Sequence, residues 1–287
     1  MKYENTGRDT YMKNVRLMLA TALVLIVADG LATQAAVERP ICTDIGSQRY
    51  PAIWEDRIIW MEVQNGNWTI TLYDLTTGEG KRIHTGLASP RYPAISGDRI
   101  VWTDVRNGNW DIYLYDLASG TETRICAHPG LQKNPAISGD RIVWEDWRHG
   151  NPDIYMYDLS TGKEIAICAD PTFQEDPAIS GNKIVWMDFR NGNWDIYLYD
   201  LATGTETPVC TDPSSQRYPG ISGNRIVWAD PRKGTWDIYL YDLDNGTETQ
   251  ITAGLNSQHY PSISGDRIVW EDYRNGNADI YLHELSR

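Results

Sequence analysis

The sequence predicts an all-β fold made of six four-stranded antiparallel sheets, and three observations support that prediction. A unit of 42 residues recurs along the chain, and each copy carries one residue of the series Trp60, Trp102, Trp144, Trp186, Trp228 and Trp270. Each unit contains short runs of β-branched and aromatic residues that are separated by glycine-containing turns. The chain holds 12 Trp and 17 Tyr, which suits sheets that are covered on both faces. One such unit cannot bury its own apolar surface, so the copies must pack on one another.

Four strands are expected in each unit. In the second unit they cover residues 93–96, 99–104, 111–117 and 121–126. The turns between them are marked by Gly97-Asp98, Asn107-Gly108 and Ser119-Gly120, which are dipeptides typical of tight turns. The second and third strands are apolar on both faces, as a sheet between two neighbours requires.

The two ends of the chain predict how the ring closes. The six units begin near residues 41, 83, 125, 167, 209 and 251, and the last one stops at Arg287 after its third strand. Residues 37–42 (VERPIC) align with residues 121–126 (TETRIC). We therefore expect residues 37–42 to supply the fourth strand of the last sheet, which would close a six-bladed β-propeller over residues 37–287 and remove its open edges.

Residues 1–36 have the composition of a leader. Lys13 and Arg16 precede an apolar run over residues 17–28, and small residues follow at 33–36. This order is typical of a secretory signal peptide, with translation starting at Met1 or Met12. The alternative is an uncleaved anchor, but the run is shorter than the roughly 20 residues that span a membrane. We expect a secreted or cell-surface protein with no membrane span after cleavage.

Two of the units, PAISGDRIVWEDWRHGNPDIYMYDL and PAISGNKIVWMDFRNGNWDIYLYDL, resemble the TolB-type six-bladed propeller repeat, in the form found in archaeal cell-surface proteins. The resemblance extends over residues 37–287. It implies an exported interaction or surface module without an assigned partner, and we expect that partner to be a protein or glycan of the cell envelope. It does not imply one activity, because propellers serve as binding proteins, scaffolds and enzymes.

Charge and motifs narrow the function further. The formal net charge of −13 argues against nucleic acid as a partner, since binding to phosphates requires a basic surface. The sequence contains no G-x-S-x-G, no phosphate-binding glycine loop and no H-E-x-x-H. We therefore expect a monomeric, non-catalytic binding protein without a cofactor.

Binding residues are expected on one face of the propeller. The loops that join consecutive units and the hairpins between the second and third strands emerge together, and these are the longer loops. We call this side the loop-rich face and the other the tight-turn face, where little room for a site is expected. In the hairpins, Trp147, Phe189 and Tyr273 occupy one repeat position. These rings either form a stacking surface for a sugar or partner peptide or pack against the hairpin.

The same hairpins repeat the pattern Asp-x-Arg-Asn-Gly-Asn-x-Asp, which contributes five arginines to the candidate binding face: Arg106, Arg148, Arg190, Arg232 and Arg274. An oxygen-rich loop of this kind can bind Ca²⁺. The favoured alternative is structural, with the carboxylates capping the turn and pairing with arginine. A residue present in nearly every unit is more typical of the scaffold than of a specific site.

Other candidates arise where one unit departs from the rest. His128, His149 and Asp146 fall on the loop-rich face and are candidate ligands for Zn²⁺ or another transition metal. The alternative function is a carbohydrate-active or metal-dependent enzyme, of the polysaccharide lyase or hydrolase type, with its site at the channel mouth. Its candidate residues are Arg49, Arg91, Arg217, His128 and His259.

The cysteines at one repeat position are Cys42, Cys126, Cys168 and Cys210. Equivalent outer-strand residues of neighbouring blades lie beyond the reach of a disulfide. We therefore expect free, partly buried thiols.

Overall fold

The computed structural model describes residues 38–64, 66–83, 89–126 and 128–286. The chain divides into two units, residues 1–35 and residues 36–287, and everything described below belongs to the second. The predicted signal peptide lies outside the described residues. Within the described ranges, no helix has the length and hydropathy needed to cross a membrane.

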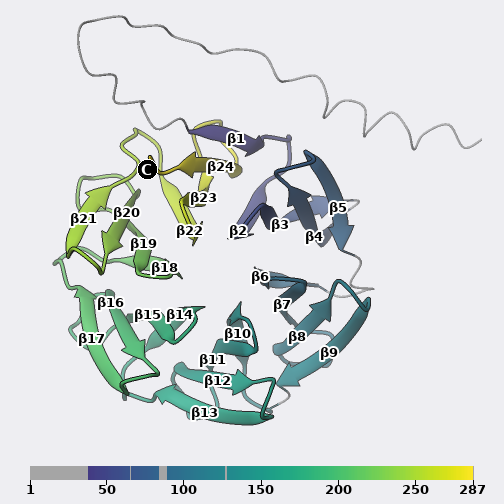
Figure 1. The fold of residues 1–287 in the computed structure, drawn as a ribbon, viewed down its shortest axis with the longest axis vertical. Coiled ribbons are helices and arrows are strands. Elements are labelled where there is room, and N and C mark those ends of the chain that lie inside the picture. Colours follow the sequence, from purple (N-terminus) through teal and green to yellow (C-terminus); the bar gives the residue numbers. More distant parts are fainter. Residues whose placement is uncertain (1–37, 65, 84–88, 127, 287) are drawn as a thin grey trace, which may run out of the picture. The chain divides into compact units, whose positions relative to one another are not determined.

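The described residues form an all-β fold of six four-stranded antiparallel sheets, or blades, around a common centre (Figure 1). Blade 1 contains β2 (Gln48–Trp54), β3 (Arg57–Gln64), β4 (Asn67–Asp74) and β5 (Glu79–Ile83). Blade 2 contains β6 (Arg91–Ser96), β7 (Arg99–Asp104), β8 (Asp111–Asp116) and β9 (Thr121–Cys126). Blade 3 contains β10 (Gln132–Ser138), β11 (Arg141–Asp146), β12 (Asp153–Asp158) and β13 (Lys163–Cys168).

The second half of the ring repeats this order. Blade 4 contains β14 (Gln174–Ser180), β15 (Lys183–Asp188), β16 (Asp195–Asp200) and β17 (Thr205–Cys210). Blade 5 contains β18 (Arg217–Ser222), β19 (Arg225–Asp230), β20 (Asp237–Asp242) and β21 (Thr247–Gln250). Blade 6 contains β22 (Gln258–Ser264), β23 (Arg267–Asp272), β24 (Asp279–Glu284) and β1 (Arg39–Cys42).

Blade 6 is closed by the N-terminal strand, as the alignment of the two chain ends predicts. β1 pairs antiparallel with β24, with Arg39 opposite Leu282 and Cys42 opposite Ile280 (Figure 1). Glu38, just before β1, accepts a hydrogen bond of 2.8 Å from Arg274. The exchange covers the edge of β24, which would otherwise present unpaired backbone groups.

The apolar core lies between neighbouring blades. Trp144 of blade 3 is fully buried and belongs to one cluster with Val101, Ile112 and Leu114 of blade 2. Its ring stacks on that of Tyr155 in the next strand, with centroids 6.4 Å apart. Blades 4, 5 and 6 repeat the arrangement around Trp186, Trp228 and Trp270. The recurring tryptophan therefore fills the wedge between blades, which explains its fixed spacing.

On the tight-turn face, arginines are paired across blades. Arg99 binds Asp140 of the next blade at 2.6 Å, and Arg225 and Arg267 make the same contact with Asp266 and Asp56. The expectation that this face has little room is wrong at one place. A groove of about 350 Å³ lies between blades 1 and 2, lined in part by Asp98, Lys81 and Glu79.

The cysteines are free, as expected. Cys126, Cys168 and Cys210 are buried rather than partly buried. Burial raises the pKa of the Cys168 thiol to about 12 and that of the Cys126 thiol to about 11. These thiols therefore stay protonated and behave as small apolar side chains.

Candidate functional site

The innermost strand of every blade starts with an irregular step that turns a side chain toward the centre. Its register against the second strand shifts at this point, for example between Arg49 and Ala52. The residue before the proline has a left-handed backbone, with φ between 48° and 58° at Tyr50, Tyr92, Asn134, Asp176, Tyr218 and Tyr260. Asn and Asp tolerate this conformation, whereas Tyr adopts it only at a cost in strain. Strain repeated in six blades suggests that the inward direction of these side chains matters.

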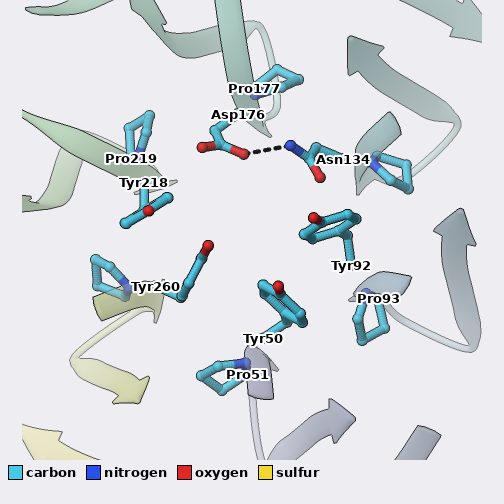
Figure 2. Close-up of a pocket in the computed structure, with 12 residues that line it drawn as sticks. Tyr50, Pro51, Tyr92, Pro93, Asn134, Asp176, Pro177, Tyr218, Pro219 and Tyr260 are labelled. Atoms are coloured by element: carbon cyan, nitrogen blue, oxygen red, sulfur yellow. Dashed lines mark hydrogen bonds between the residues drawn. The ribbon is translucent and has the colours of Figure 1, made fainter. Parts of the chain in front are cut away.

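These six residues form what we call the channel ring. Figure 2 shows their side chains pointing from all six blades toward the axis. With the prolines that follow them they line a cavity of about 130 Å³. The rings of Tyr218 and Tyr260 lie 3.9 Å apart between centroids, and Tyr50 contacts Tyr92 and Tyr260 at 4.5 and 4.7 Å. The channel is therefore narrowed by packed aromatic rings on one side.

The other side of the channel ring carries a polar network (Figure 2). Asn134 donates a hydrogen bond of 2.6 Å to the Asp176 carboxylate. Glu145, behind them in the second strand of blade 3, accepts bonds from Asn134 and from the backbone N–H of Asp176. Burial raises the pKa of Glu145 to about 7, and burial together with the Glu145 charge raises the pKa of Asp176. Both carboxyl groups therefore hold a proton at a higher pH than they would in water.

The residues one step earlier in each innermost strand form what we call the mouth ring, which lies at the loop-rich end of the channel. Its members are Arg49, Arg91, Lys133, Glu175, Arg217 and His259. Neighbours in this ring influence one another, because Arg217 and Lys133 both lower the pKa of Glu175, which burial raises. Burial and the charges of Arg49 and Arg217 lower the pKa of His259 to about 4, so it is neutral near pH 7. Four cations thus face one carboxylate.

Each cation of the mouth ring lies over an aromatic ring. Arg91 is 5.0 Å from the Trp68 centroid, and Lys133 is 5.6 Å from that of Trp147. The other two pairs are Arg217 with Trp236 at 5.7 Å and Arg49 with Tyr273 at 5.4 Å. These contacts hold the cations in place through the negative faces of the rings, and for Arg91, Lys133 and Arg217 no carboxylate among the described residues lies within ion-pair distance.

One sector of the mouth gathers several titratable groups. Glu271 is fully buried and accepts hydrogen bonds from the Tyr50 backbone N–H at 2.6 Å and the Tyr273 hydroxyl at 3.0 Å. Arg49 lies 3.4 Å from the same carboxylate. Burial raises the pKa of Glu271 to about 7 although these partners lower it. A carboxyl group with a pKa near neutral can exchange a proton under physiological conditions.

The five hairpin arginines predicted as binding residues contact carboxylates and tyrosine rings of the scaffold. Arg148 donates to the buried Asp146 through its backbone N–H, Nε and a terminal nitrogen at 2.9, 2.8 and 2.6 Å. It also pairs with Glu164 at 2.7 Å and lies 4.0 Å over the Tyr155 ring. Equivalent carboxylates and an equivalent Tyr ring contact the other four arginines: Arg106, Arg190, Arg232 and Arg274. These contacts match the structural alternative, because the charge of each arginine is already compensated.

The candidate metal ligands are also used locally. His128 accepts a hydrogen bond of 3.0 Å from the Gly130 backbone, and His149 bonds the Tyr155 hydroxyl at 3.2 Å. Asp146 is enclosed by the hairpin, so the structure does not gather the three as one ligand set. Among the described residues, three potential ligands come within 4.8 Å of one another at Cys42, Asp44 and Glu62. Burial raises the pKa of Cys42 to about 12, which disfavours the thiolate that a metal requires.

The predicted aromatic residues lie at the rim of the mouth, but only Phe189 is substantially exposed. Its ring packs at 5.1 Å against Trp194, and 37% of the residue is accessible. Trp147 packs at 6.3 Å against Phe173, and Tyr273 contacts His259 at 5.6 Å. The rings therefore pack against neighbouring side chains, and Trp147 and Tyr273 also contact cations of the mouth ring.

Exposed apolar side chains gather on the loop-rich face. Among the described residues, seven large hydrophobic residues are exposed, and six of them lie in its loops and hairpins: Ile45, Val63, Val105, Phe173, Phe189 and Leu255. Ile45 and Leu255 are 102% and 94% exposed. The seventh, Ile165, is in the outer strand β13. An apolar rim of this kind around a channel is typical of an interaction surface.

Sequence reasoning missed several of these residues. Lys133 and Glu175 share the repeat position of Arg49, Arg91, Arg217 and His259 but were not singled out. The channel ring was also missed, although a residue followed by proline at the start of every unit is a visible sign of irregular backbone. Glu145 and Glu271 occupy a position that holds Met, Thr or Ala in the other blades.

No family model matches the chain, and no curated protein matches it. Among solved structures, TolB from Acinetobacter baumannii is similar with a TM-score of 0.63 and 20% identity, over 82% of this chain and 65% of that one. Tricorn protease is similar with a TM-score of 0.66 and 16% identity, over 83% of this chain and 25% of that one. Oligogalacturonate lyase from Vibrio parahaemolyticus has a TM-score of 0.59 and 11% identity, over 89% and 95%.

These comparisons show the fold, which is a TolB-like six-bladed β-propeller. The neighbours differ in activity, and the chain spans less than two thirds of the length of TolB and of tricorn protease. Function must therefore be argued from the site of this chain.

Proposed function

We propose that this protein is an exported, non-catalytic binding protein whose loop-rich face docks a protein or glycan of the cell envelope. The observation that carries the proposal is the clustering of exposed apolar side chains on this face, around a cationic channel mouth. Export is supported by the charged and apolar pattern of residues 13–28. Binding requires no chemistry from these residues, only a rigid surface, which six mutually packed blades provide.

Replacing two exposed rings of this face tests the proposal. The double variant Phe173→Ser and Phe189→Ser is expected to weaken association with an envelope fraction by about 100-fold, because each ring removed from an interface costs about 1.4 kcal/mol or more. The matched control is Ile165→Ser, which removes a side chain of similar exposure, 46%, from the outer strand. Sedimentation binding with purified envelopes measures both. Equal affinity of the double variant and the control would show that the loop-rich face is not the docking surface.

A second candidate function rests on Glu271. Its pKa of about 7 and its contacts with Arg49 and Tyr273 at the mouth suit a general acid or base. One of the structurally similar proteins is an oligogalacturonate lyase, so acidic polysaccharides are the substrates to assay first. Glu271→Gln is expected to lower any such turnover by at least 100-fold, in line with the loss of a general base. Wild-type inactivity across acidic polysaccharides, with and without divalent cations, would exclude lyase activity on them.

A further inference from the structure

Three of the four cations of the mouth ring differ from most arginines of the described chain, because they form no ion pair among the described residues, whereas Arg49 pairs with Glu271. Arg91, Lys133 and Arg217 have no carboxylate within 4.0 Å among the described residues, whereas the hairpin arginines and most arginines of the tight-turn face do. The Nε atom of Arg217 is buried and makes no hydrogen bond within the same residues. An unsatisfied buried donor on a charged group is costly, and an incoming acceptor would relieve that cost.

The local charge is opposite to that of the whole chain. The formal net charge is −13, so the long-range field repels anions, yet the mouth presents Arg49, Arg91, Lys133 and Arg217 around one channel opening. Within the mouth ring Glu175 is the one carboxylate that opposes them, and Glu271 of the second strand pairs with Arg49. Burial lowers the pKa of Arg91, which indicates a guanidinium that has lost solvent. A partly desolvated cation binds an anion more strongly than a fully hydrated one.

The composition of the rim around these cations favours a protein partner over a glycan. Sugars stack on aromatic faces, but the faces of Trp68, Trp147 and Trp236 are already occupied on one side by the cations. Much of the exposed rim is aliphatic, at Ile45, Val63, Val105 and Leu255. Aliphatic side chains offer no stacking surface and suit the apolar side chains of a polypeptide.

We propose that the channel mouth binds an acidic segment of a protein partner, whose carboxylates contact Arg91, Lys133 and Arg217 while its apolar side chains pack on the surrounding rim. This rests on the proposed function, since it names the partner of the same loop-rich face. The narrow channel ring beneath the mouth stops the segment from passing through. The carboxylates therefore meet the cations at the opening. These cations come from the innermost strands β2, β6 and β10 of three successive blades and from β18 on the opposite side of the ring.

The test uses the folded protein and two defined polyanions, poly-L-glutamate and polygalacturonate, with binding measured by fluorescence anisotropy at fixed salt. Wild type is expected to bind poly-L-glutamate, and to bind it more tightly than polygalacturonate. Arg91→Ala, Lys133→Ala and Arg217→Ala are each expected to weaken that binding by about tenfold, which corresponds to about 1.4 kcal/mol. The matched control is Arg141→Ala, which removes an arginine from the tight-turn face, where it bonds Asn182 rather than a carboxylate.

A gain of affinity separates this proposal from general damage to the fold. Glu175→Gln removes the one carboxylate of the mouth ring and is expected to tighten poly-L-glutamate binding by about three- to tenfold, consistent with the loss of a nearby like charge. Absence of poly-L-glutamate binding, unchanged binding in the three cation variants, or tighter binding of polygalacturonate would each overturn the acidic-segment proposal. The docking function would survive those results if the Phe173 and Phe189 double variant still lost its envelope partner.

Discussion

Asp188→Ala is expected to lower the free energy of unfolding by about 3–5 kcal/mol, the range for removing one partner of a buried ion pair. The Asp188 carboxylate is fully buried and accepts hydrogen bonds from the Trp186 indole at 3.0 Å and from the Arg190 backbone and side chain at 2.9, 2.8 and 2.5 Å. Its loss leaves a buried indole N–H and the hairpin amide without acceptors. Among the described residues, Arg190 then keeps Glu206, at 2.6 Å, as its one ionic partner.

Blade 2 provides a control at the same repeat position. Asp104 is equally buried, but the Trp102 indole nitrogen makes no hydrogen bond among the described residues, and Arg106 contributes only two bonds to this carboxylate. Asp104→Ala should therefore cost less than Asp188→Ala. Thermal melting measures both, and 3–5 kcal/mol corresponds to a fall in midpoint of roughly 6–20 °C for a domain of this size. A smaller loss of stability for Asp188→Ala than for Asp104→Ala would show that the contacts of this carboxylate with Trp186 and Arg190 do not stabilise the blade.

The same hairpin shows why the fold was predictable from sequence. Apolar residues alternate on both faces of strands such as β11 (Arg141–Asp146), and Asn-Gly or a similar dipeptide follows. The same pattern of strands and turns occurs in six copies at a fixed spacing. A misleading residue in one copy is therefore outweighed by the other five. The closing strand was visible for a similar reason, because VERPIC fills the position that the last unit lacks. Strand order and packing therefore follow from local patterns that agree with one another.

The candidate site was predictable only in part. Arg49, Arg91, Arg217 and His259 were recognised as residues near the channel, but Lys133 and Glu175 differ in type and break the visual pattern of the repeat. The left-handed backbone at Tyr50 and its equivalents is set by the register shift and by packing against neighbouring strands, and tyrosine gives little sign of it. Charge compensation was also hidden. Whether an arginine is paired, as Arg148 is with Asp146, depends on contacts between strands that spacing alone does not fix.

The buried carboxyl groups of the channel predict an unusual dependence of stability on pH. Glu145 is 3% exposed, and its pKa is raised from 4.5 to about 7 by burial, with only partial relief from hydrogen bonds. The folded state therefore holds this proton more tightly than the unfolded state. Its contribution to stability is fully present below pH 4.5 and is lost as the pH rises through 7. Glu271, which also has a pKa raised to about 7, acts in the same direction.

Other titratable groups change the stability with pH in the opposite direction. The prediction is therefore stated as a difference between a variant and wild type. The pKa of His259 is lowered to about 4 by burial and by the charges of Arg49 and Arg217, and its contribution is lost as the pH falls. Comparing Glu145→Gln with wild type cancels that background, because both proteins retain His259. Glutamine keeps an oxygen to accept the bond from the Asp176 backbone N–H, which measures 2.8 Å.

At pH 5 the two proteins should melt at nearly the same temperature, because Glu145 is then neutral and similar in shape to glutamine. At pH 8 the Glu145→Gln variant should be more stable by as much as about 3 kcal/mol, since a shift of one pKa unit corresponds to about 1.4 kcal/mol. Melting curves at half-unit steps between these limits should show the difference growing as the pH rises from 5 and levelling off above about pH 7. A constant difference across the whole range would mean that Glu145 ionises normally in the folded protein, and that the polar side of the channel admits enough water to solvate its charge.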